Sequence, residues 1–296
     1  MFVAWRDLKF AKGRFALMGA VIVLITLLVG LLPGLTAGLG QQNISAITGL
    51  PADRIAFQAP GDGQDLPYSD STVTRPQWQR WSTAPGVQSA EPLGITTTRA
   101  TTGDGSTAVS AFGVEPGSRL APGSDKITDS AVVLSAAAAD TLGVEAGGSL
   151  TLAGRRLTVA AVAGGAFFSH TPVIWTSLDT WRRTAPPTGA AGEPTATVIA
   201  LNTTSGADIQ TLDQQLGTRT VSTGDSLPAI GSYASENGSL QLMRGFLFAI
   251  SAVPFPLTPA TVLFPAAVII ALGALGAALS IRRITSVDPL TALGSA

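Results

Sequence analysis

The position of the charged residues is the strongest constraint on how this chain can fold. No charged side chain lies between Arg244 and Arg282, a stretch of 37 residues, and none lies from Phe15 to Gly40. An α-helix rises about 1.5 Å per residue, so 37 residues would form a rod of roughly 56 Å, against a hydrocarbon core of about 30 Å. The later run is therefore too long for one straight membrane helix. All four of its prolines lie at or before Pro265, which predicts that its first half is broken.

A basic, amphipathic segment precedes the first uncharged run. Its apolar residues Phe2, Trp5, Leu8 and Phe10 can share one side of a helix, opposite Arg6, Lys9 and Lys12. This pattern is typical of a helix that lies along a membrane surface. A cleavable signal peptide is the alternative, but its apolar region spans about 7 to 15 residues, whereas Phe15 to Leu32 is an unbroken run of 18. The length favours a membrane anchor.

Between these two runs the composition becomes polar and rich in Gly, Pro, Ser, Thr and Asp. Charged residues make up only 12% of the whole chain, compared with about 25% in a typical soluble domain, so the apolar ends dominate the average. Residues 41–240 are enough to bury a core of their own. Short strand-like and helix-like patterns alternate in this region, which predicts a mixed α/β domain.

Four stretches of this domain carry local predictions. "GGSLTLAGRRLTVAAVAGG" has two strand-like runs joined across Ala153 to Arg155, as in a β-hairpin. "DSAVVLSAAAADTLGVEAGG" predicts a strand and then a helix from about Ser135 to Leu142 that stops at Gly143. "HTPVIWTSLDTWRR" predicts a strand and then a helix capped by Ser177 or Asp179. "TTTRATTGDGSTA" is interpreted as a loop.

The distribution of charge predicts the topology. Residues 41–240 hold 17 acidic and 11 basic side chains, a net charge of −6, whereas the flanks that face the spans carry a net charge of +4. Lys and Arg near the ends of membrane spans stay on the cytoplasmic side. We therefore expect a multi-pass protein of the cell membrane with both termini cytoplasmic and the large domain extracytoplasmic. Two membrane crossings, one before and one after the domain, place the basic flanks on the cytoplasmic side.

Composition excludes several kinds of chemistry. The chain has no cysteine, which removes thiolate metal sites and cysteine nucleophiles, and its net charge of −1 offers no basic surface for nucleic acid. None of its three lysines follows a glycine, so the P-loop that ATP hydrolysis requires is absent. His170 is the only histidine, and any catalytic triad or haem ligation by imidazole would need it. A solvated or satisfied polar group is the ordinary alternative for a lone loop histidine, and we expect neither an enzyme nor a bound cofactor.

Small residues occur at helical spacing in the second uncharged run. Gly273 and Ala277 form a small-x-x-x-small pair, which permits close approach of two membrane helices. The ordinary tolerance of membrane helices for glycine and alanine is the alternative. The spacing makes the pair a candidate helix-packing site.

Three segments resemble a known family. They are "FVAWRDLKFAKGRFALMGAVIVLITLLVGLLPGLTAGL" at the start, "VVLSAAAADTLGVEAGGSLTLAGRRLTVAAV" in the domain and "RRITSVDPLTALG" near the end. Together they resemble the FtsX/MacB-like permeases of ABC transporters, and among these the actinobacterial type similar to haem-exporter permeases. The resemblance implies an α+β membrane protein in which transmembrane helices flank a mixed α/β extracytoplasmic MacB-like core domain. It also implies a homodimer, contact with membrane lipid and a separate cytoplasmic ABC ATPase.

The chain departs from this family in its membrane region. Such permeases have three spans after the outer domain, and a cytoplasmic loop among them contributes to ATPase docking. Here "LQLMRGFLFAISA" resembles the start of the second span, and the sequence after Val253 resembles the fourth with its lead-in. We interpret the proline-rich junction as an internal deletion of the second-to-third transmembrane region.

These observations predict three parts of the chain. Residues 1–40 form the interfacial helix and the first span, 41–240 the extracytoplasmic domain and 241–296 the C-terminal membrane region. That last region comprises an interfacial or truncated span at 240–257, a transmembrane helix at 261–281 and a cytoplasmic tail. The predicted ATPase docking face is basic: Arg6, Lys9, Lys12 and Arg14. A plain interfacial anchor is its alternative.

Two functions from different classes remain open, with a third less favoured. The leading prediction is a permease subunit that couples the ATPase to export or extraction of a hydrophobic or amphipathic substrate, haem being one candidate. The second is a transport-inactive, membrane-anchored binding or assembly module that kept only the outer domain. A membrane-tethered cell-wall hydrolase is the weakest, because the chain offers little chemistry for it.

Overall fold

The computed structural model describes residues 12–61, 66–103, 105–185, 194–236 and 238. The chain divides into two units, and the larger is Pro33–Ser239. The predicted spans at 240–257 and 261–281 lie outside the described residues. The predicted boundary between the extracytoplasmic domain and the C-terminal membrane region, at residue 240, also lies outside the described residues.

The first described element is a long helix, α2 (Lys12–Thr48). Large apolar side chains are exposed along it, from 48% at Val21 to 67% at Leu24 and 63% at Leu31. Near its C-terminal end the pattern changes, and Ala46 and Ile47 are buried. In the described part of the chain, no helix has the length and hydropathy expected of a membrane crossing. The multi-pass topology therefore stays a prediction.

The larger unit is a mixed α/β domain, as predicted. Its strands are β1 (Arg54–Gln58), β2 (Val73–Thr74), β3 (Val87–Thr101), β4 (Ser106–Val114), β5 (Ala131–Leu134), β6 (Ser149–Leu152), β7 (Arg155–Val162), β8 (Phe167–Phe168), β9 (Thr171–Ser177), β10 (Pro194–Ala196), β11 (Val198–Thr203) and β12 (Thr218–Ser222). Its helices are α3 (Arg75–Ser82), α4 (Ala136–Leu142), α5 (Leu178–Thr184) and α6 (Ile209–Leu216), with 3-10 turns η1 (Ser124–Lys126) and η2 (Leu227–Ala229). Residues 231–236 are also helical and are called the exit helix below.

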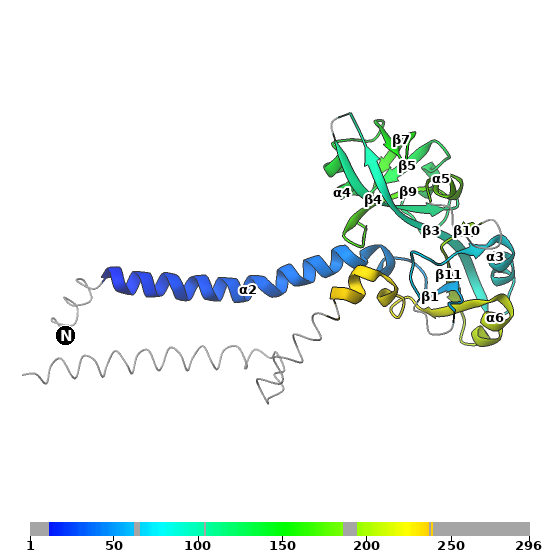
Figure 1. The fold of residues 1–296 in the computed structure, drawn as a ribbon, viewed down its shortest axis with the longest axis horizontal. Helices are drawn as coiled ribbons and strands as arrows, with labels where there is room; N and C mark the ends of the chain where they lie inside the picture. Colours follow the sequence, from blue (N-terminus) through cyan, green and yellow to red (C-terminus); the bar gives the residue numbers. More distant parts are fainter. Residues whose placement is uncertain (1–11, 62–65, 104, 186–193, 237, 239–296) are drawn as a thin grey trace, which may run out of the picture. The chain divides into compact units, whose positions relative to one another are not determined.

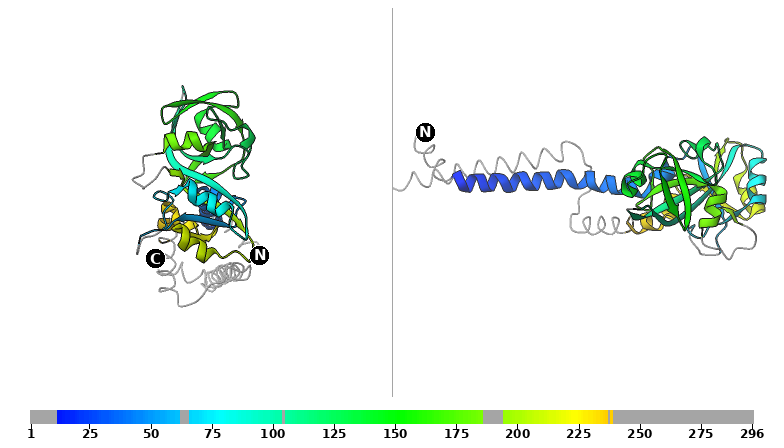
Figure 2. Two further views of the ribbon diagram at one scale, coloured as in Figure 1. Left: turned by 90° about the vertical axis from the view of Figure 1, so that its right-hand side faces the viewer. Right: turned by 90° about the horizontal axis from the view of Figure 1, so that it is seen from above.

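Strand β3 divides this domain into two lobes. Its first half pairs with β11 in the strand order β12-β1-β11-β3, and α3 and α6 accompany this sheet lobe. Its second half pairs with β4 and starts the order β3-β4-β9-β5-β7-β6. The pairs Ala100↔Leu152 and Thr101↔Thr151 join β6 back to β3. These six strands therefore close into a small barrel, which is seen as a separate lobe in two views (Figures 1 and 2).

The barrel is filled by side chains that alternate along its strands. Successive residues of a strand point to opposite faces, and Leu150 and Leu152 on β6 face the same interior as Leu157 and Val159 on β7. All four are at most 2% exposed. The barrel lobe is thus a packed core and not a channel.

Two glycines form the joint at which β3 passes from one lobe to the other. Gly94 on β3 lies opposite Gly113 on β4, and the ring of Trp181 from α5 lies on both. A Cβ at Gly94 would be 2.2 Å from Trp181 Cδ2, and one at Gly113 would be 2.4 Å from Trp181 Cβ. Only glycine leaves room for the indole here. Ile95 follows Gly94 on β3, and its N–H donates a hydrogen bond to the hydroxyl of Thr197 at 2.8 Å.

Three of the four local predictions are confirmed. Strands β6 and β7 form the predicted antiparallel hairpin, with Ala153 and Gly154 both at positive φ in its turn. Helix α4 ends at the predicted Gly143, which adopts the left-handed conformation at φ 61°. Ser177, rather than Asp179, caps α5 by accepting a hydrogen bond from the backbone N–H of Thr180.

The interpretation of "TTTRATTGDGSTA" as a loop is wrong. Residues up to Thr101 belong to β3 and those from Ser106 onward belong to β4, so only the turn between them is irregular. Threonine is β-branched and favours strands when a partner strand is available. The stretch has too few apolar residues to show alternation, because its outer face is solvated. Pairing with β4 and β6 decides its structure.

Candidate functional site

The tight turn between β8 and β9 has an unusual backbone. Ser169 and His170 adopt φ values of 50° and 62°, the two positive values that a type I′ hairpin turn requires. Glycine and asparagine usually supply them, and other residues in the left-handed region cost roughly 1–2 kcal/mol each. Such strain persists only where surrounding contacts hold it, and it is frequent at functional sites. The contacts around Ser169 and His170 must therefore stabilise this backbone conformation.

Helix α2 provides the first of these contacts. The N–H of Ser169 donates to the carbonyl of Asn43 at 2.9 Å, and the N–H of His170 donates to the carbonyl of Gln42 at 3.1 Å. The Ser45 hydroxyl, two residues after Asn43, accepts from the N–H of Phe167 at 2.9 Å. The C-terminal part of α2 is thus bound to the β8–β9 hairpin through backbone groups and the Ser45 hydroxyl.

The exit helix provides the second set of contacts, through side chains. Ser232 donates to Asn43 Oδ1 at 2.7 Å and shares a 2.8 Å hydrogen bond with Ser169. Asn43 Nδ2 donates to one oxygen of Glu236 at 3.1 Å, and His170 Nε2 lies 2.5 Å from the other. We call this set, Asn43, Ser169, His170, Ser232 and Glu236, the polar junction.

The polar junction combines a buried centre with an accessible rim. Asn43 is fully buried, and its amide is satisfied by contacts to two residues of the exit helix. The side chains of His170 and Glu236 are 34% and 44% exposed. A half-exposed ion pair is screened by water and contributes little to stability by itself. The junction therefore determines which chain segments meet, and it contributes little to the stability of the whole domain.

An aromatic group continues from the junction towards the sheet lobe. Phe168 packs edge-on against Phe112 and Tyr68, and Tyr68 packs against Phe57 of β1, with ring centroids 4.8–5.7 Å apart. The Tyr68 hydroxyl donates to Ser226 at 2.9 Å. Burial raises the pKa of this hydroxyl, so it stays neutral and acts as a hydrogen-bond donor. The β8–β9 hairpin is thereby packed against both lobes.

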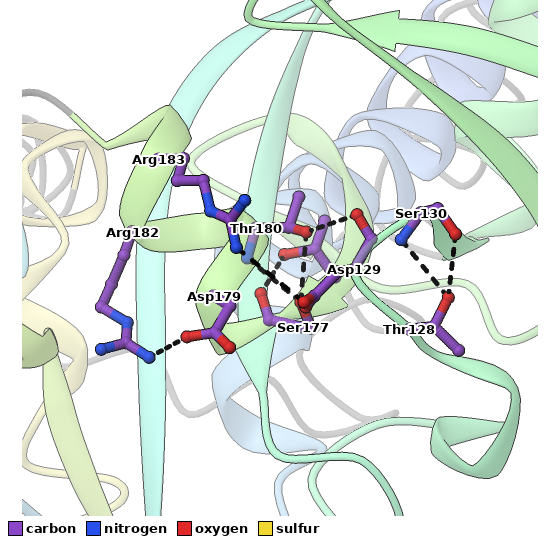
Figure 3. A network of polar contacts seen from close by, with 9 residues as sticks. Thr128, Asp129, Ser130, Ser177, Asp179, Thr180, Arg182 and Arg183 are labelled. Atoms are coloured by element: carbon purple, nitrogen blue, oxygen red, sulfur yellow. Dashed lines mark hydrogen bonds and ion pairs between the residues drawn. The ribbon is translucent and has the colours of Figure 1, made fainter.

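A second polar network fixes α5 on the barrel lobe (Figure 3). The Ser177 hydroxyl donates to Asp129 Oδ1 at 2.6 Å while accepting from the N–H of Thr180, and Thr180 donates to the carbonyl of Asp129 at 3.0 Å. Arg183 adds an ion pair to Asp129 at 3.8 Å. No histidine belongs to these contacts, and Ser177 acts as a helix cap. This network holds Trp181 on the glycine joint.

The side chains of the two networks bind one another and backbone groups of the domain. In the ranges that the structure describes, no group of three His, Asp or Glu side chains is arranged to hold a metal ion. The Nε2 of His170 is bound to a carboxylate, which corresponds to the ordinary alternative of a satisfied polar group. What the polar junction can do is join three chain segments and respond to a change in charge.

The structure leaves the predicted site residues untested. Lys12 and Arg14 lie in the first turn of α2. The remaining predicted positions lie outside the described ranges: Arg6, Lys9, Gly273 and Ala277. The ATPase docking face and the helix-packing pair stay predictions.

Sequence reasoning did not identify the polar junction, except for His170. A signal was present in "FFSHTPVIW", where two residues separate two apolar, strand-like runs, as in a hairpin. The partners Asn43, Ser232 and Glu236 had no such signal. They are ordinary polar residues far away along the chain.

Comparison with known proteins gives one family match and several structural likenesses. The family model of the MacB-like periplasmic core domain matches residues 15–219. The periplasmic region of MacB from Actinobacillus actinomycetemcomitans is 14% identical with a TM-score of 0.41, over 60% of this chain and 92% of that one. The extracellular domain of the ABC-type transporter YknZ from Gram-positive bacteria is 13% identical with a TM-score of 0.41, over 57% of this chain and 99% of that one.

Proposed function

The chain belongs to the family of MacB-like periplasmic core domains, and from this premise we propose that it is the membrane-anchored permease subunit of an ABC transporter. In this proposal residues 41–240 work outside the cytoplasm. A separate cytoplasmic ATPase supplies the energy. The net charges of −6 in the domain and +4 in the flanks support this arrangement.

The family match over residues 15–219 is the observation that carries the proposal. It begins inside α2 and extends across both lobes, so the apolar helix and the domain are matched together. The same helix has exposed apolar side chains from Val21 to Leu31 and buried ones at Ala46 and Ile47. A helix of this kind suits a protein whose domain must be fixed to a lipid-facing segment.

The domain suits mechanical coupling better than catalysis. Helix α2 leads into the domain and the exit helix leads out of it, and the polar junction binds both to the β8–β9 hairpin. A displacement of either helix would therefore reach the barrel lobe directly. We propose that such displacement accompanies the export or extraction of a hydrophobic or amphipathic substrate, haem being one candidate, by a homodimer in contact with membrane lipid.

Binding of the ATPase is the test of this proposal. The purified chain should hydrolyse no ATP by itself, and it should capture the ATPase encoded beside it in a pull-down. Reversing charge at Lys9 and Lys12, by Lys9→Glu and Lys12→Glu, should weaken capture. Lys126→Glu is the matched control, because this exposed residue lies in the domain. Capture that is equal for all variants would reject the docking face, and no capture by the unaltered chain would reject the coupling.

A transport-inactive, anchored module is the second proposal, and the length of one segment favours it. Leu240 to Val253 comprises 14 residues, about 21 Å as a helix, and it includes Arg244. Such a segment is shorter than the hydrocarbon core. Export should be compared, with the same ATPase, between this chain and a version in which the missing spans are restored. We expect export only from the restored version, and equal export from both would show that the short chain transports by itself and would reject the inactive module.

A further inference from the structure

We propose that the polar junction is a pH-responsive clasp, which holds the exit helix to the β8–β9 turn and α2 more tightly when His170 is protonated. All five residues of the junction belong to the larger unit, and the clasp is independent of the transport function proposed above.

The charges of the three segments that meet here are few and complementary. No charged residue lies between Arg14 and Asp53, so the C-terminal part of α2 contributes only neutral groups. His170 is the only ionisable side chain of the β8–β9 segment, between Arg156 and Asp179. The exit helix carries Glu236 and, three residues before it, Tyr233. One base and one acid are present in these segments, and the fold brings them into contact.

Protonation changes the nature of that contact. Imidazole is the side chain whose ordinary titration lies between pH 5 and 8, whereas a carboxylate remains ionised over this interval. With His170 neutral, Nε2 can donate to the Glu236 carboxylate oxygen 2.5 Å away only in the tautomer that carries its proton on Nε2. With His170 protonated, both ring nitrogens carry a proton and the ring is positively charged, so the same contact becomes a hydrogen bond between opposite charges. Lower pH therefore favours the closed junction.

The strengthened contact between His170 and Glu236 is connected to the rest of the polar junction. The other oxygen of Glu236 accepts from Asn43, and Ser232 connects Asn43 to Ser169. Loss of the His170 contact thus removes the charged end of a continuous network. It also removes a side-chain contact from His170, one of two adjacent residues held at positive φ. The turn and the exit helix should open together.

Hydrogen exchange of the full-length chain at pH 6 and pH 8, corrected for intrinsic rates, tests the clasp. Peptides covering residues 166–172 and 230–236 should be about two- to five-fold better protected at pH 6, as expected for a partly exposed ion pair. His170→Gln keeps an amide for hydrogen bonding but cannot titrate, and Glu236→Gln keeps the acceptor without its charge. Each should abolish the difference between the two pH values.

Arg182→Gln is the matched control, because it removes an ion pair with Asp179 on α5 and leaves the junction intact. It should retain the full pH difference. A difference that persists in His170→Gln, that is absent from the unaltered chain or that has the opposite sign would overturn the proposal. If one of the two junction variants fails to fold, the other decides alone.

Discussion

At the scale of single residues, the most demanding position is the glycine joint under Trp181. The indole occupies the space that two side chains would need, and its own N–H is buried without a hydrogen-bond partner within the described ranges. An unsatisfied buried donor is unfavourable, so the packing of the ring must offset it. The contact between the indole and the two glycines therefore depends on shape, while the polar network around Asp129 positions α5.

Replacing either glycine of the joint should destabilise the domain. Gly94→Ala and Gly113→Ala place a Cβ at 2.2 Å and 2.4 Å from Trp181, and we expect each to lower the free energy of unfolding by about 1–3 kcal/mol through overpacking. Urea denaturation followed by tryptophan fluorescence measures the change. Gly165→Ala is the control, because no atom lies within 4 Å of its added Cβ. A loss as large in the control would contradict the steric explanation.

At the scale of elements, short helices on the barrel lobe depend on their first residue. Ser135 caps α4 with one accepted hydrogen bond, whereas Ser177 caps α5 and also donates to Asp129. Both side chains are buried or nearly so. The two caps are chemically identical, but they differ in the number of contacts they make.

The two caps should therefore differ in their contribution to stability. Ser135→Ala should lower the free energy of unfolding by about 1 kcal/mol, the usual contribution of a cap. Ser177→Ala also removes the hydrogen bond to Asp129, so its loss should be about 2 kcal/mol. Denaturant titration of both variants under one condition gives the comparison. Equal losses would mean that the contact with Asp129 contributes nothing.

A disulfide across the polar junction should show whether it must open. The chain has no cysteine, and the hydroxyls of Ser169 and Ser232 are 2.8 Å apart, so Ser169→Cys with Ser232→Cys introduces a single pair. Oxidation should link the turn to the exit helix. In the proposed transporter it should stop ATP-driven export, and reduction should restore it.

The two single-cysteine variants are the controls for this experiment, because neither can form the link. Both should export equally under oxidising and reducing conditions. Undiminished export by the fully oxidised pair would show that transport does not require the junction to move.

At the scale of the whole molecule, the charge distribution and the family match predict one topology. The domain carries a net charge of −6, and the flanking segments are basic. Basic residues near membrane spans remain on the cytoplasmic side. The family description as a periplasmic domain agrees with a domain on the opposite side.

Alkaline phosphatase fusions should reveal this topology. The enzyme is active only outside the cytoplasm, so a fusion at Gly105 should be active and a fusion at Ala296 inactive. Gly105 lies in the turn between β3 and β4, where an insertion interrupts no strand. A cytoplasmic reporter at the same two positions should give the opposite result. Activity confined to Ala296 would refute the predicted orientation.

The sequence by itself determined the local elements of the domain. The β6–β7 hairpin follows from Ala153 and Gly154 between two alternating runs, and the ends of α4 follow from Ser135 and Gly143. These signals act within a few residues, because turns and caps are decided by local backbone geometry. The mixed α/β character of the domain could be predicted for the same reason.

The tertiary structure decided how these elements meet. Nothing local in residues 87–101 indicates that β3 leaves one sheet at Leu93 and joins another at Gly94, because the partners that cause this lie on β11 and β4. His170 and Glu236 are 66 residues apart in the sequence and 2.5 Å apart in space. Pairing of strands and polar groups over such separations depends on the whole fold, which no short window of sequence contains.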